Sequence, residues 1–262
     1  YWLFAILGMW MLLYVMNAYA WRIIIRGSGD CPIPFWKILK VTITGFALNY
    51  ATPAGLMGGE PYKIMEFQPY IGTQRATSSV LLFAMMHIFS HFWFWASSIV
   101  VYVLLAAMGI LPLGTGMGIT LFLMLCFCGG GIYLFSRGYK NGMVVKIIHL
   151  FSRIPGLKKW TQKILDNHKE DLQKIDSQIS ELHSQNRKSF YASFCLEYAG
   201  RILQSFEIYF MLILFDAGNG GGLTFIYSFL ILSFTSLFAN LLFFMPLQLG
   251  GREGGFAMSV AQ

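Results

Sequence analysis

Two short segments repeat one another inside apolar sequence, and each ends on a carboxylate. The residues that the two segments share are Asn49, Pro53, Gly58, Gly59 and Glu60 in the first and Asn240, Pro246, Gly250, Gly251 and Glu253 in the second. Proline lacks a backbone N–H and glycine loses the most entropy when it is held helical, so both segments interrupt helices. Interrupted helices in corresponding positions of two halves of a chain indicate the substrate site of a membrane transporter.

The two glutamates are the sharpest candidates for chemistry. A carboxylate at membrane depth is costly unless it is paired or hydrated, which makes Glu60 and Glu253 functional candidates. A structural role is the alternative, because a carboxylate also stabilises the N-terminus of a half-helix. Lys63 and Arg252 are the neighbouring countercharges. They could equally bind an anionic headgroup, since a guanidinium fork matches phosphate, and the free N–H groups at the glycine pairs would bind the same anion.

Two further pairs of polar residues share a helix face, because their members are four positions apart. Glu197 and Arg201 form either a self-neutralised pair that snorkels near the cytoplasmic end of a span or a site in which the arginine binds phosphate. His87 and His91 lack a third ligand and the glutamate of a zinc-binding motif, so we expect hydrogen-bonded interior histidines or a pH-sensitive gate rather than a metal site. Glu207 has no assigned role.

The composition places the chain among helical membrane proteins. Only 12% of its residues are charged and 56% are hydrophobic, with a mean hydropathy of +0.58, whereas soluble domains carry roughly a quarter charged residues. The basic stretch 137–189 is interleaved with acids and flanked by apolar sequence, so attraction to anionic lipid explains it better than nucleic-acid binding. No phosphate-binding or dinucleotide motif is present, and we expect no cofactor and no metal.

We expect an all-α, polytopic fold. Stretches long enough to span a bilayer, which takes about 20 residues, are 1–25, 77–108, 119–136 and 190–215. The stretch 36–50 is too short to cross alone and forms, with 61–68, a re-entrant hairpin around the first break. A further apolar run, 223–245, leads into the second break.

The placement of Lys and Arg predicts the orientation. The segments 22–40, 60–76 and 137–189 carry nearly all basic residues, whereas the loops 109–118 and 216–222 carry none. Basic residues collect on the cytoplasmic side, so the amphipathic linker 137–189 is expected there. The first hairpin then enters from the cytoplasm and the second from outside, as in inverted-topology repeats.

This scheme treats residues 1–262 as one transmembrane domain. The first repeat is 1–136, and the second is 190–262, which we expect to be truncated because its closing spans are missing. Each hairpin is about half a membrane long at 1.5 Å per residue. We therefore expect Glu60 and Glu253 close together at mid-depth.

At these residues the chain resembles a known family. The segments LNYATPAGLMGGEPYK and FMPLQLGGREGG are similar to the two signatures of the lysylphosphatidylglycerol synthase/flippase membrane-domain family. Lys63 stands where arginine is common, and Glu60 where aspartate is common. The resemblance implies two re-entrant hairpins and lipid translocation. The soluble aminoacyl-transferring domain of such proteins is not in this chain, so a synthase is not predicted.

Three functions follow from these observations. The leading one is a flippase that moves a phospholipid or a lipid-linked anionic headgroup through a polar cavity between the hairpins. The others are an intramembrane transferase acting on polyprenyl-phosphate-linked or phospholipid substrates, and a membrane scaffold. The expected partners are membrane lipids in the inner or plasma membrane, with self-association left open. The expected substrate-binding residues are Asn49, Gly58, Gly59, Glu60, Lys63, Glu197, Arg201, Asn240, Gly250, Gly251, Arg252 and Glu253, with Pro53 and Pro246 as helix breaks.

Overall fold

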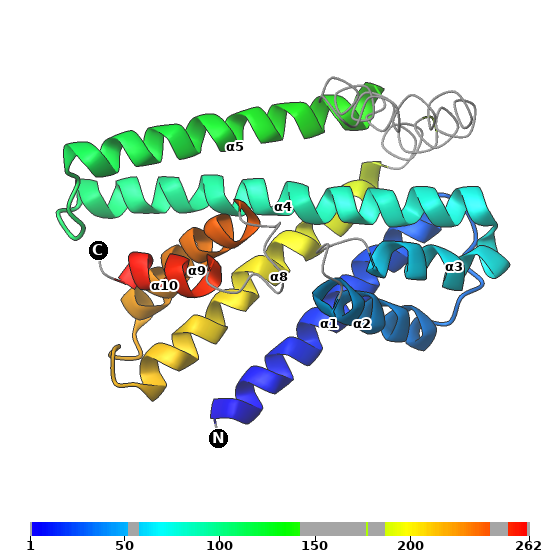
Figure 1. The fold of residues 1–262 in the computed structure, drawn as a ribbon, viewed down its shortest axis with the longest axis horizontal. Coiled ribbons are helices and arrows are strands. Elements are labelled where there is room, and N and C mark those ends of the chain that lie inside the picture. Colours follow the sequence, from blue (N-terminus) through cyan, green and yellow to red (C-terminus); the bar gives the residue numbers. More distant parts are fainter. Residues whose placement is uncertain (1, 52–57, 142–176, 178–186, 242–250, 261–262) are drawn as a thin grey trace.

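The computed structural model describes residues 2–51, 58–141, 177, 187–241 and 251–260. Within these ranges the chain is helical and holds no strand, so the predicted all-α class is confirmed (Figure 1). The helices are α1 (Trp2–Gly27), α2 (Phe35–Ala51), α3 (Gly59–Ile71), α4 (Thr73–Ala107), α5 (Thr115–Asn141), α8 (Arg187–Leu214), α9 (Gly222–Leu241) and α10 (Gly251–Val260). The amphipathic helix expected within 137–189 lies almost wholly outside the described residues.

Among the described helices, four are long and apolar enough to cross a membrane: α1, α4, α5 and α9. The first three are predicted spans, and α9 is the limb expected to lead into the second break. Helix α8 is also a predicted span and has 28 residues. It falls outside this group because Glu197, Arg201 and Glu207 interrupt its apolar sequence. A membrane location for the chain follows from these apolar helices.

The two helix pairs that flank the predicted breaks lie toward opposite ends of the molecule (Figure 1). Helices α4 and α5 run side by side along the long axis, and α1 packs against α8 across them. The α2–α3 pair occupies the end at which α1 finishes and α4 begins, while α9 and α10 pack together toward the other end. Inverted repeats and re-entrant insertion stay predictions.

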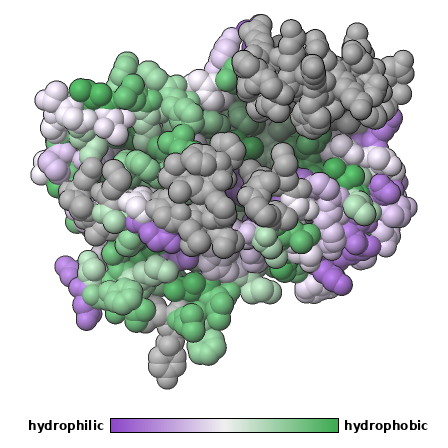
Figure 2. Space-filling view, viewed as in Figure 1, coloured by the Kyte–Doolittle hydropathy of each residue, from purple (hydrophilic) through white to green (hydrophobic). Residues whose placement is uncertain are grey.

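The outer surface of the bundle is apolar over α5 and the first turns of α1, and more hydrophilic at the end formed by α2 and α3 (Figure 2). Large exposed apolar side chains on these two helices are Leu3, Phe4, Leu7, Met11, Leu12, Ile119, Phe122, Leu123, Leu125, Phe127, Tyr133 and Leu134. Such a surface is costly in water, and large exposed apolar patches mark surfaces that contact a membrane or another protein. It is the surface expected to contact lipid.

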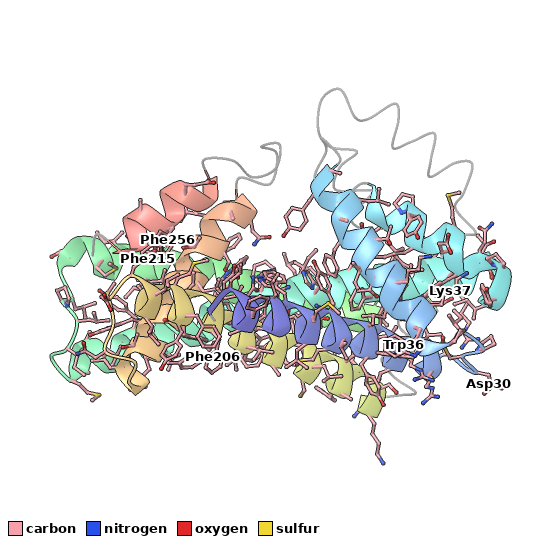
Figure 3. The ribbon with its side chains drawn as sticks, turned by 90° about the horizontal axis from the view of Figure 1, so that it is seen from below. Asp30, Trp36, Lys37, Phe206, Phe215 and Phe256 are labelled. Atoms are coloured by element: carbon pink, nitrogen blue, oxygen red, sulfur yellow. The ribbon has the colours of Figure 1, made fainter. Side chains whose placement is uncertain are left out.

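The two ends of the bundle differ in chemistry (Figure 3). Asp30 and Lys37 lie at the end where α2 begins, together with the exposed Trp36. Phe206 and Phe215 lie toward the opposite end. Tryptophan and lysine at one end suit a membrane–water interface, where amphipathic rings and snorkelling ammonium groups are stable.

The interior holds two apolar clusters that meet along α4. In the first, the buried Trp21 ring stacks on Phe67 at 4.5 Å and on Phe83 at 5.6 Å between centroids. Along α4 this cluster ends at Phe89, and the second begins at Phe94. The stretch of α4 near this junction carries polar side chains, and the candidate site is built there.

Candidate functional site

The N-terminus of α3 is held against α2 by a side-chain amide. The Gly59 N–H donates to Asn49 Oδ1 at 2.8 Å, and Asn49 Nδ2 lies 3.5 Å from Glu60 Oε1. Lys63, one turn further along α3, places its Nζ 3.1 Å from the same Glu60 oxygen. Lys63 is therefore the countercharge of Glu60, as the sequence analysis expects.

The Lys63 ammonium is buried among aromatic rings. Only 2% of its side chain is exposed, against 22% for Glu60. Its Nζ lies 5.8 Å from the Trp21 ring centre, 5.0 Å from Phe46 and 5.6 Å from Phe83. Cation–π attraction is strongest when the cation is desolvated, so the rings and the carboxylate together compensate the burial of this charge.

Gly45 of α2 leaves the space that the Lys63 side chain fills. A Cβ at position 45 would come 2.5 Å from Lys63 Cε, with two further carbons of that side chain within 3.4 Å. Glycine is the residue that permits such a close approach. Gly45 was not among the residues predicted from the sequence, although its position four residues before Asn49 puts both on one face of α2.

Gly45→Ala is expected to lower the free energy of unfolding by about 1–3 kcal/mol, the usual cost of overpacking. Alanine gains about 1 kcal/mol of helix propensity, but Lys63 is enclosed by rings and has little room to move. Thermal unfolding in detergent measures the effect. Gly118→Ala in α5 is the matched control, because nothing lies within 4 Å of a Cβ there; an equal response of both variants would contradict the close packing.

A second polar group joins α4 to α8. His87 Nδ1 lies 2.8 Å from Glu197 Oε2, and Arg201 Nη2 lies 2.9 Å from His87 Nδ1 and 2.6 Å from its Nε2. His87 thus lies between Glu197 and Arg201. Of the two alternatives from the sequence, a self-neutralised pair that snorkels to the interface does not fit the burial of the Glu197 side chain, which is 1% exposed. Arg201 as a phosphate ligand stays a prediction.

The two polar groups adjoin one another through an aromatic ring. The Phe46 ring centre lies 5.8 Å from that of His87 and 5.0 Å from Lys63 Nζ. The positive charge of Lys63 acts on both His87 and Glu197. Four helices, α2, α3, α4 and α8, thus bring two carboxylates and two cations around one histidine.

Two carboxylate oxygens in this site have no hydrogen-bond partner. They are Glu60 Oε2 and Glu197 Oε1, and both atoms are buried. Buried polar atoms are normally hydrogen-bonded, and exceptions call for an explanation. Oxygens of this kind can take up a proton or accept a hydrogen bond from water or from a ligand. The site can therefore bind a polar ligand in addition to its internal pairs.

A comparison with protein families shows the family to which the chain belongs. The family described as "Lysylphosphatidylglycerol synthase TM region" matches residues 1–262, the whole chain. The chain belongs to this family. No curated protein and no solved structure gave a match. The resemblance inferred from the two glycine-rich segments is therefore confirmed, and membership supports a lipid-related function in a membrane.

In this member of the lysylphosphatidylglycerol synthase transmembrane-region family, the second glycine-rich segment is described only in part. Pro246 and Gly250 lie outside the described residues, as does Pro53 of the first segment. Gly251 begins α10, and Glu253 is exposed in the first turn of that helix. The Arg252 side chain is also outside the description. The expected proximity of Glu60 and Glu253 stays a prediction.

The remaining predicted residues have ordinary local roles. Asn240 is exposed and donates to the Ser236 carbonyl within α9 at 2.7 Å. Gly58, the N-cap of α3, has right-handed backbone angles of −88° and −37°, so its conformation does not require glycine.

His91 is buried next to His87, with ring centroids 5.4 Å apart and no partner for its Nδ1. Within the described part of the chain, no cluster of three or more metal-binding side chains occurs.

An open pocket of about 360 Å³ lies on the outer side of α2 and α3. The residues that line it are Trp36, Lys37, Lys40, Val41, Tyr62 and Glu66. Lys37 Nζ lies 3.2 Å from Glu66 Oε2 and 3.2 Å from the Tyr70 hydroxyl oxygen. The bond to Tyr70, followed by that to Glu66, raises the pKa of Lys37 above its usual value, so this lysine is charged at neutral pH.

Proposed function

We propose that the protein is a lipid flippase that carries an anionic headgroup past the site formed by Glu60, Lys63, His87, Glu197 and Arg201. The single observation that carries the proposal is this charge-balanced group inside a membrane bundle. Intramembrane ionisable residues are expensive and usually serve transport or binding. A site that only held helices together would be as stable with well-packed apolar side chains.

The exchange of partners provides a low-barrier route for a phosphate. Arg201 and Lys63 already have acceptors within the protein, so a phosphate oxygen replaces one charge-assisted hydrogen bond by another. The headgroup therefore enters without leaving a buried cation unpaired. The guanidinium of Arg201 suits this role because its donors match phosphate geometry. The acyl chains stay against the apolar outer surface.

The proposal also includes the orientation of the chain in the membrane and the lipids that it binds. We place the basic linker 137–189 on the cytoplasmic side of an inner or plasma membrane, because basic residues collect there. Helices α2–α3 and α9–α10 are proposed as re-entrant hairpins of inverted repeats, with Glu253 and Arg252 serving the opposite half of the pathway. The partners are phospholipids or polyprenyl-phosphate lipids.

An intramembrane transferase is the second candidate, and one contact favours it. His87 donating to a carboxylate resembles a general base oriented by an acid. However, Arg201 occupies the Nε2 atom that would have to accept the proton, at 2.6 Å. Incubation with a labelled polyprenyl-phosphate sugar and a lipid acceptor separates the candidates, because a covalent product appears only for a transferase.

Reconstitution into liposomes tests the flippase directly. With a fluorescent phosphatidylglycerol and a membrane-impermeant quencher, Arg201→Gln and Glu60→Gln are expected to slow translocation roughly tenfold or more, the loss associated with one charge-assisted hydrogen bond. Arg137→Gln and Glu66→Gln are the matched controls. Arg137 contacts the exposed Tyr133 hydroxyl, and Glu66 pairs at the surface with Lys37, so both variants should translocate at the wild-type rate.

The outcome can contradict the proposal in two ways. Robust translocation in Arg201→Gln and Glu60→Gln would remove these residues from the pathway. Equal slowing in all four variants would indicate a general effect of lost charge. A wild-type protein that leaves the lipid on its original leaflet in every vesicle composition tested would refute the flippase itself.

A further inference from the structure

The contacts of His87 define which of its ring nitrogens carries the proton. Arg201 Nη2 is a donor only, and it lies 2.6 Å from Nε2 and 2.9 Å from Nδ1. Because Nε2 is the nearer nitrogen and Nδ1 also lies 2.8 Å from Glu197 Oε2, we assign the accepting lone pair to Nε2 and the hydrogen to Nδ1, which donates it to Glu197. A doubly protonated ring would set an N–H against the guanidinium of Arg201. The arrangement in the structure requires a neutral His87.

We propose that His87, oriented by Glu197, is a proton-binding site coupled to anion binding at Arg201. When His87 takes up a proton at Nε2, it can no longer accept from Arg201. The guanidinium is then released toward an incoming anion, while the imidazolium remains paired with Glu197. Proton binding and headgroup binding thus favour one another. The inference rests on the anion site of the proposed function and adds its coupling to protons.

The charges around His87 explain why the proton and the anion should arrive together. The charged and titratable side chains linked to this group come from α2, α3, α4 and α8. They are Tyr50, which acts on Arg201, together with Glu60, Lys63, His91, Glu197 and Arg201 itself. Tyr14 of α1 interacts with Tyr50. Two carboxylates and two cations balance while both histidines are neutral. One added proton leaves an excess positive charge in a poorly solvated place, and one bound anion cancels it.

Within the hydrogen-bonded pair of His87 and Glu197, the histidine is the more exposed member. Its side chain is 26% exposed, whereas that of Glu197 is 1% exposed. A proton can therefore arrive on Nε2 without opening the carboxylate to solvent. His91 differs in both respects, because it is buried and makes no contact with Arg201 that would be broken by protonation.

Thermodynamic linkage gives the sign of the effect. If a proton raises the affinity for an anion, the anion raises the affinity for the proton by the same factor. Affinity for an anionic headgroup is then expected to rise as the pH falls, by at most about tenfold per pH unit for one proton. Binding of the headgroup should take up as much as one proton from the buffer.

Calorimetric titration of the full chain in detergent measures this uptake. Dihexanoyl phosphatidylglycerol is the probe, because its phosphodiester does not titrate between pH 5 and pH 8, a range of about three units around histidine's usual value. Titrations in two buffers of different ionisation enthalpy give the number of protons taken up. We expect uptake in the wild type and none in His87→Asn, whose amide can still donate to Glu197. His91→Asn is the matched control and should retain uptake.

Each result decides the inference. Proton uptake that persists in His87→Asn, or a wild type that binds the probe with no uptake, overturns it, as does a wild type that fails to bind the probe. A thermal unfolding midpoint for each variant identifies misfolding. If His87→Asn fails to fold, Glu197→Gln replaces it, and removal of this charge should move the pH range of uptake downward. Failure of the flippase proposal gives a different result: the protein binds the probe with proton uptake but does not translocate the lipid.

Discussion

Glu60→Gln is expected to destabilise the protein strongly, and adding Lys63→Met is expected to restore the stability without restoring translocation. The single variant leaves the Lys63 ammonium, 2% exposed, without a carboxylate. Removal of one partner from a buried ion pair costs about 3–5 kcal/mol. Methionine is apolar, flexible and of similar length, so it can fill the space among the three rings. We therefore expect that the fold tolerates the loss of both charges together, whereas translocation does not.

Thermal unfolding in detergent and lipid translocation in liposomes are measured for both single variants and the double variant. The double-mutant cycle isolates the interaction of the two charges. Lys37→Met with Glu66→Gln forms the matched cycle at the surface, where the two side chains are 29% and 36% exposed. Surface pairs contribute about 0–1 kcal/mol. Translocation at the wild-type rate in the Glu60→Gln/Lys63→Met protein would show that the charges serve folding alone.

Most of the helices could be predicted from the sequence, because the length of an apolar stretch and the positions of proline and glycine are local features of the chain. The spans expected at 1–25 and 77–108 correspond to α1 and α4, and the short stretches around the first break correspond to α2 and α3. The interruption and the Glu60–Lys63 pair both follow from spacing within one segment. Local spacing does not show whether a helix such as α9 crosses the membrane or turns back within it.

The other half of the site depends on contacts between distant segments. His87 meets Glu197 across 110 positions of sequence, and no pattern within α4 predicts that partner. The same spacing that correctly put Glu197 and Arg201 on one face suggested a direct pair, because a histidine from another helix could not be foreseen. Tertiary packing, rather than periodicity, decides these partners.

Family membership and the geometry of the site answer different questions. Membership of the lysylphosphatidylglycerol synthase transmembrane-region family covers the whole chain and supports a lipid-related role. It does not say how a charged headgroup is handled. The site supplies that part of the argument, since its cations have internal acceptors, and the proposal is that a phosphate replaces them.

Gly59→Ala is the second change with a large expected effect. A Cβ at position 59 would collide with the Gly45 carbonyl oxygen and would come 2.7 Å from Asn49 Oδ1. The Gly45 carbonyl oxygen belongs to the backbone, so it cannot rotate away from the new methyl group as a side chain can. Helix α3 would have to separate from α2, breaking the 2.8 Å bond from Gly59 N–H to Asn49. We expect a loss of about 3 kcal/mol, the upper part of the range for overpacking.

The same displacement carries Glu60 and Lys63 away from Phe46 and His87, so translocation should fall with stability. Gly129→Ala is the matched control: it is a helical glycine in α5 with nothing within 4 Å of a Cβ, and alanine should raise stability there by up to about 1 kcal/mol. Unfolding midpoints and translocation rates are compared for the two variants. If Gly59→Ala retains the wild-type values of both, then α3 does not approach α2 as closely as described, and the Asn49–Glu60–Lys63 arrangement on which the flippase proposal depends is incorrect.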